Sequence, residues 1–282
     1  MDSSDHVLAR TFAGPSNPTR IGVEAAVRAV QEAANLCLRE AQLDLSAIGA
    51  IGAGLAGTAN SEMREHTRVA LEKTFPGVRL TLLTDLEAAL AAAGEGQVIV
   101  LVAGTGSAAI GRNKRNEIVR SGGWGPLSSD QGSAFDVGRR AIAAATKSHT
   151  EMGAPSTLEQ QILVQLGCSS WPEVQQRAEA APDQVYPRIF PVIAAAADAG
   201  DAAVRGILLS AVAELSSLVK EVADRLGFHR TEFKLAKTGG MFGRSTFFDE
   251  QFDTAATRIL PHARLGGLRI SPAEAAALAA RC

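Results

Sequence analysis

The stretch that decides the fold runs from Gln97 to Phe135 and reads QVIVLVAGTGSAAIGRNKRNEIVRSGGWGPLSSDQGSAF. It opens with the apolar run Val98–Val102, whose β-branched residues predict a strand buried on both faces of a sheet. The tetrapeptide Gly104–Ser107 follows and sets two glycines beside two hydroxyl side chains. Such a turn lets backbone N–H groups approach a phosphate closely, although a glycine turn after a strand also occurs for purely structural reasons.

The residues after this turn predict a β-hairpin. Ala108–Gly111 and Glu117–Arg120 flank the polar tetrapeptide Asn113–Asn116, so the chain is expected to leave and return as two antiparallel strands. The return strand leads into GGWGP at 122–126 and then DQGS at 130–133, ahead of a helix expected from about Gly132 to Lys147. From the residues alone, Trp124 is either a core aromatic or the wall of a ligand pocket, and Asp130 could be no more than the N-cap of this helix.

Three more places carry residues with a chemical as well as a structural interpretation. Asp85 follows the predicted strand Val78–Leu83 and precedes a helix, so it is either the helix N-cap or a carboxylate at the ligand-binding end of a strand. Asn17 lies in a turn cluster after a short strand predicted for Val7–Phe12. Gly239 and its neighbour Gly240 follow the predicted strand 233–237, as a tight turn or as a site of close ligand approach.

The composition is that of a globular protein, with 282 residues, 46% hydrophobic and 21% charged. A formal net charge of −2 with scattered Lys and Arg argues against nucleic acid or an anionic membrane as a partner. The apolar runs are short and the first ten residues are polar, so neither a membrane span nor a signal peptide is expected, and we expect a cytoplasmic protein. Three distant cysteines, at 37, 168 and 282, argue against a disulfide framework or a zinc site.

Taken together, the strand, the GTGS turn, the hairpin, GGWGP and D-x-G-S resemble the N-acetylglucosamine kinase / BadF-BadG-BcrA-BcrD-type ATPase family of the actin-like and sugar kinase superfamily. Further matches are GPSNPTRIG around Asn17, TDLEAA from Thr84, TGG before Met241, and SPAEAAAL in the final helix, so the resemblance covers nearly the whole chain. Gln131 departs from the acidic residue that usually follows the aspartate in D-x-G-S, and Glu274 from a usual glycine.

The resemblance implies an α/β, two-lobed, ribonuclease-H-like (actin-like ATPase) fold with the site in the cleft, and ATP-dependent phosphorylation of N-acetylglucosamine or glucosamine with Mg²⁺. Asp85 would be the catalytic base. Asn17 and Asp130 would bind the sugar, Trp124 would line its pocket, and Asp130 could instead help to hold magnesium. The implied ATP-binding residues are Gly104, Thr105, Gly106, Ser107, Gly239 and Gly240, with the Thr105 and Ser107 hydroxyls donating to the γ-phosphate.

The same resemblance gives the expected domain organisation. An N-terminal lobe would cover residues 1–103, a C-terminal lobe with a helical insertion 104–270, and a terminal helix 271–282 would pack back towards the N-terminal lobe. The family's D-G-G-G-T-K-T-like phosphate hairpin has no counterpart in the sequence, so the N-terminal lobe is expected to be incomplete. Either the reading frame begins upstream of Met1, the explanation we favour because the other motifs are well formed, or the chain is a degenerate relative. Expressed from Met1, it is expected to be poorly stable and inactive.

Two other functions remain open at the level of sequence. An ATPase activator of a radical dehydratase would need cysteines grouped to hold an iron–sulfur cluster at a dimer interface, whereas Cys168 stands alone in a helical region. A non-catalytic sugar- or nucleotide-sensing relative would fit the missing hairpin. The sequence leaves a homodimer open and does not identify the sugar or the hydroxyl that is phosphorylated.

Overall fold

The structure is a computed structural model that describes residues 1–152 and 156–281, and the chain folds into two compact units. The N-terminal unit consists of Met1–Glu95 and Leu268–Cys282, and the central unit of Gly96–Gly267. The sequence placed the first boundary at 103/104, but the strand that ends at Ala103 pairs with strands of the central unit, so the division falls at 95/96.

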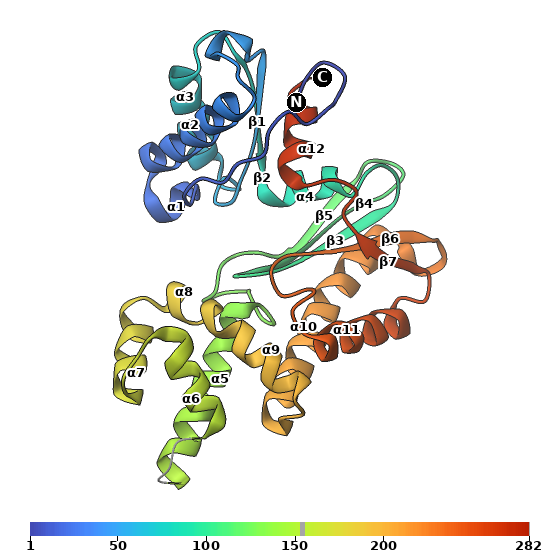
Figure 1. Cartoon of the computed structure of the whole chain (residues 1–282). Coiled ribbons are helices and arrows are strands. Elements are labelled where there is room, and N and C mark those ends of the chain that lie inside the picture. The colour runs from blue at the N-terminus through green and yellow to red at the C-terminus, as the bar shows by residue number, and fades with distance from the viewer. Residues whose placement is uncertain (153–155, 282) are drawn as a thin grey trace. The chain divides into compact units, whose positions relative to one another are not determined.

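The N-terminal unit holds a parallel pair of strands with helices on both faces (Figure 1). Its elements are α1 (Pro18–Ile21), α2 (Val23–Glu40), β1 (Ala50–Leu55), α3 (Ser61–Thr74), β2 (Arg79–Thr84), α4 (Asp85–Ala92) and α12 (Pro272–Ala279). Alternate residues of β1 face opposite sides, as in any strand. Ala53 and Leu55 pack with α2 and α3, whereas Gly52 and Gly54 face α12 and α4.

The glycines of β1 allow a helix to approach the strand very closely. A Cβ on Gly52 would lie 1.7 Å from the carbonyl oxygen of Ala276 in α12, and a Cβ on Gly54 would lie 2.7 Å from the Cβ of Ala88 in α4. The final helix is fixed by a capping box, in which Ser271 Oγ accepts from the Glu274 N–H at 3.2 Å and the Glu274 carboxylate accepts from the Ser271 N–H at 2.8 Å. The hydrogen bond from the Ser271 N–H, supported by the Ser271 side chain, holds the pKa of the Glu274 carboxyl below its ordinary value.

Replacing Gly52 by alanine should therefore lower the free energy of unfolding by about 1–3 kcal/mol, the usual cost of overpacking. Gly49→Ala is the matched control, because a Cβ at Gly49 meets nothing within 4 Å. Urea unfolding of both variants measures the difference. Equal midpoints for the two variants would show that α12 does not pack on β1 in solution.

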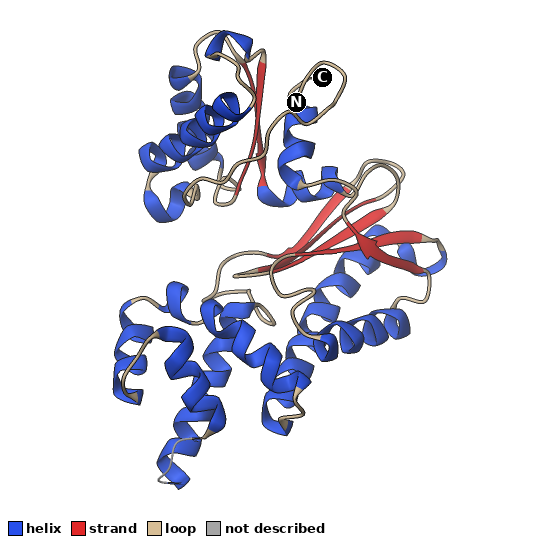
Figure 2. Cartoon of the chain, viewed as in Figure 1, coloured by secondary structure: helices blue, strands red, loops and turns tan. Residues whose placement is uncertain are grey.

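The predicted strand Val7–Phe12 is wrong. The segment is drawn as loop (Figure 2), with Thr11 Oγ1 donating to the Ala33 carbonyl of α2 at 3.3 Å and the Phe12 side chain 95% exposed. The sheet of this unit consists of β1 and β2 alone among the described residues, so the segment pairs with neither strand. A strand exists only where a neighbouring backbone completes its hydrogen bonds, and no local sequence pattern can supply that neighbour.

The central unit is built on a five-stranded sheet in the order β5-β4-β3-β6-β7 (Figures 1 and 2). Its strands are β3 (Val98–Ala103), β4 (Ser107–Arg112), β5 (Ile118–Gly122), β6 (Phe233–Thr238) and β7 (Ala263–Gly267). β3, β4 and β5 are antiparallel neighbours, and β3, β6 and β7 are parallel. The hairpin predicted after the GTGS turn is present, and β3 is buried at every residue except Val102.

Helices of the central unit cover one face of this sheet and form a lobe beyond it (Figure 1). They are α5 (Ala134–Met152), α6 (Thr157–Leu166), α7 (Trp171–Ala180), α8 (Pro182–Val185), α9 (Phe190–Asp198), α10 (Ala202–Leu226) and α11 (Thr246–Ile259). Among the described residues, α10 alone is long and apolar enough by length and composition to cross a membrane. Its apolar side is a core face of this unit, with Leu208, Ala211, Leu215, Val219 and Val222 buried against the sheet and neighbouring helices.

Candidate functional site

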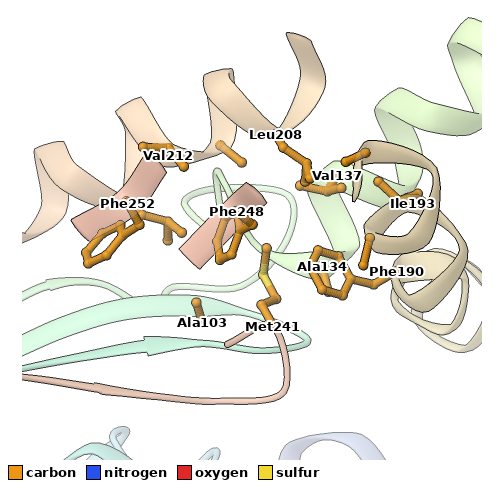
Figure 3. Packing of buried hydrophobic residues seen from close by; sticks show 14 of the residues in the cluster. Ala103, Ala134, Val137, Phe190, Ile193, Leu208, Val212, Met241, Phe248 and Phe252 are labelled. Carbon is orange, nitrogen blue, oxygen red and sulfur yellow. The ribbon is translucent and has the colours of Figure 1, made fainter. Parts of the chain in front are cut away.

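The Gly104–Ser107 turn joins β3 to β4 at the carboxyl end of β3. The Gly104 N–H donates to the Gly106 carbonyl at 2.9 Å and closes the turn. The turn begins from a fixed point, because Ala103 is fully buried in the core (Figure 3). Thr105 is exposed at the tip, so its hydroxyl and the glycine backbone around it are open to a ligand.

The second glycine turn lies directly beside the first. Gly239 follows β6, has a φ of +108°, and comes so close to β3 that a Cβ there would lie 2.2 Å from the Ala103 carbonyl oxygen. A Cβ on Gly104 would lie 3.5 Å from the Gly240 nitrogen, and the Met241 N–H donates to the Ala103 carbonyl at 3.1 Å. The two turns therefore form one surface at the carboxyl ends of two neighbouring parallel strands, where open α/β sheets bind their ligands.

The start of α5 holds the first turn from its other side. The Ala134 N–H donates to the Gly104 carbonyl at 2.9 Å, and the Phe135 N–H donates to the Thr105 carbonyl at 3.3 Å. Ala134 and Met241 both insert their side chains into the core close to the end of β3 (Figure 3). The turn is thus fixed by backbone hydrogen bonds and buried anchors, which leaves its outer surface free for ligand contacts.

The Asp130 side chain lies against the GTGS turn at Gly106. A Cβ on Gly106 would be 2.6 Å from Asp130 Oδ2, and Asp130 is 8% exposed. The Ser107 side chain is 2% exposed, and its Oγ donates to the Gln131 carbonyl at 2.8 Å. The Ser107 hydroxyl therefore joins the GTGS turn to Gln131 in the interior, and the expectation that it donates to the γ-phosphate is wrong for this structure. Thr105 carries the outward-facing hydroxyl of the turn.

Two structural alternatives left open by the sequence are wrong. Trp124 is not a core aromatic, because its side chain is 72% exposed, with the Arg120 guanidinium 4.1 Å from the ring centroid. Asp130 is not the N-cap of α5, because the helix begins at residue 134 and the Asp136 N–H is bound by Ser133 Oγ at 3.3 Å. Neither residue is accounted for by these local structural roles.

Asp85 occupies the first position of α4, immediately after β2. The N-cap is Thr84, whose Oγ1 accepts from the Glu87 N–H at 3.1 Å while the Glu87 carboxylate accepts from the Thr84 N–H at 2.8 Å. The interpretation of Asp85 as the cap is therefore wrong. Its exposed carboxylate lies in the first turn of the helix.

Asn17 caps α1 and also touches a second loop. Its Oδ1 accepts from the Thr19 N–H at 3.0 Å and from Thr19 Oγ1 at 2.7 Å. Gly57, after β1, has a φ of +84°, and a Cβ there would lie 2.2 Å from Asn17 Oδ1. The sequence signal for this contact is the run of mostly small residues at 54–57, at the carboxyl end of β1.

Asn17 and Asp85 lie at the same edge of the N-terminal sheet. Leu55 and Thr84, the last residues of β1 and β2, are register partners in a parallel pair. Gly57, which meets Asn17, comes two residues after Leu55, and Asp85 comes directly after Thr84. An amide and a carboxylate are therefore presented together at the ligand-binding end of this sheet.

The candidate residues form two groups, one within each unit. The central unit gathers the two glycine turns and Asp130, a surface suited to phosphate, and the N-terminal unit gathers Asn17 and Asp85, a surface suited to hydroxyl groups. In the part of the chain that the structure describes, no group of three His, Cys, Asp or Glu side chains is placed to hold a metal ion. Cys37 lies in the N-terminal unit and Cys168 in the central unit.

Two glycine turns side by side at the carboxyl ends of neighbouring parallel strands are typical of α/β proteins that bind phosphate-bearing ligands. The chain belongs to the BadF/BadG/BcrA/BcrD ATPase family, whose model matches residues 1–264. The family and the α/β class are those expected from the sequence.

Relatives and solved structures agree with this assignment. An N-acetylmuramic acid/N-acetylglucosamine kinase of Clostridium acetobutylicum is 29% identical over 98% of this chain and 91% of its own length. An N-acetyl-D-glucosamine kinase of Dictyostelium discoideum is 25% identical over 99% and 92%. A protein of Chromobacterium violaceum, provisionally assigned as an N-acetylglucosamine kinase, has the same fold with a TM-score of 0.77 at 22% identity, covering 94% of this chain and 88% of that one.

Proposed function

We propose that the protein transfers the γ-phosphoryl group of ATP to a hydroxyl group of an amino sugar, N-acetylglucosamine or glucosamine. The observation that carries this proposal is the meeting of the two glycine turns, in which Gly104 lies against Gly240 and Gly239 lies against β3. Membership of an ATPase family and near full-length similarity to two amino-sugar kinases support the choice of reaction. Because ATP is the donor, we place the reaction in the cytoplasm.

In the proposed reaction, a sugar hydroxyl attacks the γ-phosphorus in line with the departing β-phosphate oxygen. One P–O bond forms to the sugar, the bond to ADP breaks, and the hydroxyl proton passes to the Asp85 carboxylate. Asn17 and Asp130 would hold sugar hydroxyls, with Trp124 beside them. Positioning and charge stabilisation dominate such a reaction, because the protein supplies little covalent chemistry.

ATP would enter as its magnesium complex, the metal being part of the substrate. Gly239 and Gly240 would support the adenosine, and the Gly104–Ser107 turn would contact the γ-phosphate through backbone N–H groups and the Thr105 hydroxyl. The turn fits an anion because it is open at Thr105 and has no side chain at Gly104 or Gly106. Asp130, next to Gly106, is the carboxylate closest to this surface that could face the metal's water shell.

The assay that tests this function follows ADP release by the purified protein, with and without residues added upstream of Met1, in the presence of N-acetylglucosamine, glucosamine, N-acetylmuramic acid, glucose or no sugar. We expect ADP release to depend on an amino sugar and the product to gain one phosphoryl group by mass spectrometry. ADP release that is independent of sugar would instead identify an ATPase, and the absence of any ADP release together with sugar binding would identify a sensor.

Replacing Thr105 by alanine should lower ATP-dependent turnover by about tenfold or more, because one donor to the transferred phosphoryl group is lost. The KM for the sugar should change by less than about twofold, since Thr105 faces the nucleotide in the proposed site. Steady-state kinetics with each substrate varied in turn measures both values. A loss confined to sugar affinity would mean that the turn binds the sugar instead.

A further inference from the structure

A network of charged side chains lies beneath the turn that carries Asp130. Asp136, in the first turn of α5, is 8% exposed and accepts from Arg140 at 2.8 Å. Arg140 also donates to Glu214 of α10 at 2.6 Å. Burial opposes the charge of Arg140, but the Glu214 hydrogen bond and the nearby Asp136 carboxylate raise its pKa overall, so the guanidinium remains charged. The network therefore links α5 to α10 through ionised groups.

The Asp136 carboxylate also holds the backbone of the turn. The Gly132 N–H donates to Asp136 Oδ2 at 3.1 Å. Gly132 has a φ of +74° and is pressed onto α10, where a Cβ would lie 2.7 Å from the Ala211 carbonyl oxygen. This buried N–H needs an acceptor, and the Asp136 carboxylate provides it. The Asp136 side chain therefore helps to hold the turn on α10.

The turn at residues 130–132 also fixes the GTGS turn. The Gln131 carbonyl, one residue before Gly132, accepts from the buried Ser107 hydroxyl at 2.8 Å, and Asp130 lies against Gly106. A displacement at Gly132 would therefore move the Asp130 carboxylate and the proposed γ-phosphate surface together. Errors of about 1 Å in such a surface can reduce turnover by about 10²-fold.

We propose that Asp136 is a positioning residue for phosphoryl transfer, which holds the 130–132 turn and through it the GTGS turn, with Arg140 and Glu214 fixing its carboxylate. This inference rests on the proposed function, because it concerns the same phosphate surface. Asp136 does not touch the substrates in the proposed site. It acts through the Gly132 N–H and the hydrogen bond between Gln131 and Ser107.

Two substitutions separate the parts of this role. Asp136→Ala removes both the acceptor for Gly132 and the charge beside Arg140. Asp136→Asn keeps an oxygen that can accept from Gly132 but loses the charge. We expect kcat to fall by about 10- to 100-fold in the alanine variant and by a smaller factor in the asparagine variant, with sugar KM within about twofold. Arg139→Ala is the matched control, because Arg139 binds the same carboxylate at 3.0 Å from an exposed position, and its kcat should be unchanged.

Hydrogen exchange of the substrate-free protein supplies a readout that does not depend on activity. The amides of Gly132, Ala134 and Phe135 should exchange at least about tenfold faster in Asp136→Ala, because they report the links between the two turns. Amides in the middle of α10 should be unaffected. Should the alanine variant fail to fold, Asp136→Asn and Glu214→Gln are measured in the same way, with a smaller acceleration expected at these three amides.

The exchange and kinetic results together test the positioning role of Asp136. Unchanged exchange at Ala134 and Phe135, or uniformly faster exchange that includes α10 with kcat per folded molecule unaltered, would overturn the positioning role. If the unmodified protein phosphorylates no amino sugar, the proposed function fails. The exchange pattern then still decides whether Asp136 holds the two turns together.

Discussion

Replacing Asp85 by asparagine should lower kcat for sugar phosphorylation by a factor on the order of 10² or more, with little change in the KM for the sugar. Asparagine is nearly the same size as aspartate but cannot take the hydroxyl proton. Because Thr84 and Glu87 form the capping box, the substitution leaves the start of α4 intact. Steady-state kinetics at saturating ATP, together with a thermal melt, measures the effect.

Glu87→Gln is the matched control for Asp85→Asn. It removes a negative charge from the same helix end, while the glutamine oxygen can still accept from the Thr84 N–H. It also weakens the ion pair with Arg64, at 2.7 Å, so a modest loss of stability is expected, with kcat close to that of the unmodified protein. Near-normal kcat in Asp85→Asn would reduce Asp85 to a favourable charge at the helix N-terminus. Equal losses of kcat in both variants would point to helix electrostatics instead.

Replacing Gly239 by alanine should weaken the affinity for ATP and destabilise the central unit. The new Cβ would lie 2.2 Å from the Ala103 carbonyl oxygen and 2.9 Å from its nitrogen, and a φ of +108° is one that alanine rarely adopts. Backbone strain of this kind costs about 1–3 kcal/mol before the clash is counted. Relief of the clash would separate the two glycine turns, so the affinity for ATP should fall by about tenfold or more. Calorimetric titration with a non-hydrolysable ATP analogue and urea unfolding measure the two effects.

Two other glycines separate strain from ligand contact. At Gly240 a Cβ meets nothing within 4 Å, so Gly240→Ala should leave stability unchanged and raise the Kd for ATP only if adenosine packs on this residue. Gly206 lies inside α10, where a Cβ also meets nothing, and Gly206→Ala should raise stability by up to about 1 kcal/mol without affecting ATP binding. Normal ATP affinity in Gly239→Ala would remove the second turn from the proposed nucleotide site.

Much of the central unit could be predicted from local patterns. The β-branched run before Gly104 gave β3, and the polar tetrapeptide 113–116 gave the hairpin. Each of these features depends on residues within one turn or one strand, so the sequence carries it directly.

Local sequence patterns gave wrong predictions where the structure depends on a partner strand or on which nearby side chain caps a helix. Val7–Phe12 has the composition of a strand but forms none, because it pairs with neither strand of the sheet described for the N-terminal unit. Asp85 and Asp130 each looked like a helix cap, and in each case a neighbouring residue with a hydroxyl group binds the helix N–H instead. A shift of one to three residues in the start of a helix changes which side chain caps it. Helix ends are the boundaries that the sequence predicts least well.

The candidate site shows the same division. The sequence by itself determined that glycine turns follow two buried strands, that a carboxylate follows another, and that the motifs are those of an amino-sugar kinase family. Only the tertiary structure decided that Gly104 lies against Gly240, that the Ser107 hydroxyl donates to the Gln131 carbonyl, and that the Asp136 carboxylate accepts from the Gly132 N–H. The reason is physical. These contacts depend on the parallel pairing of β3 with β6 and on the packing of α5 against α10, which join segments far apart in the chain, whereas a turn or a strand is specified by its own neighbouring residues.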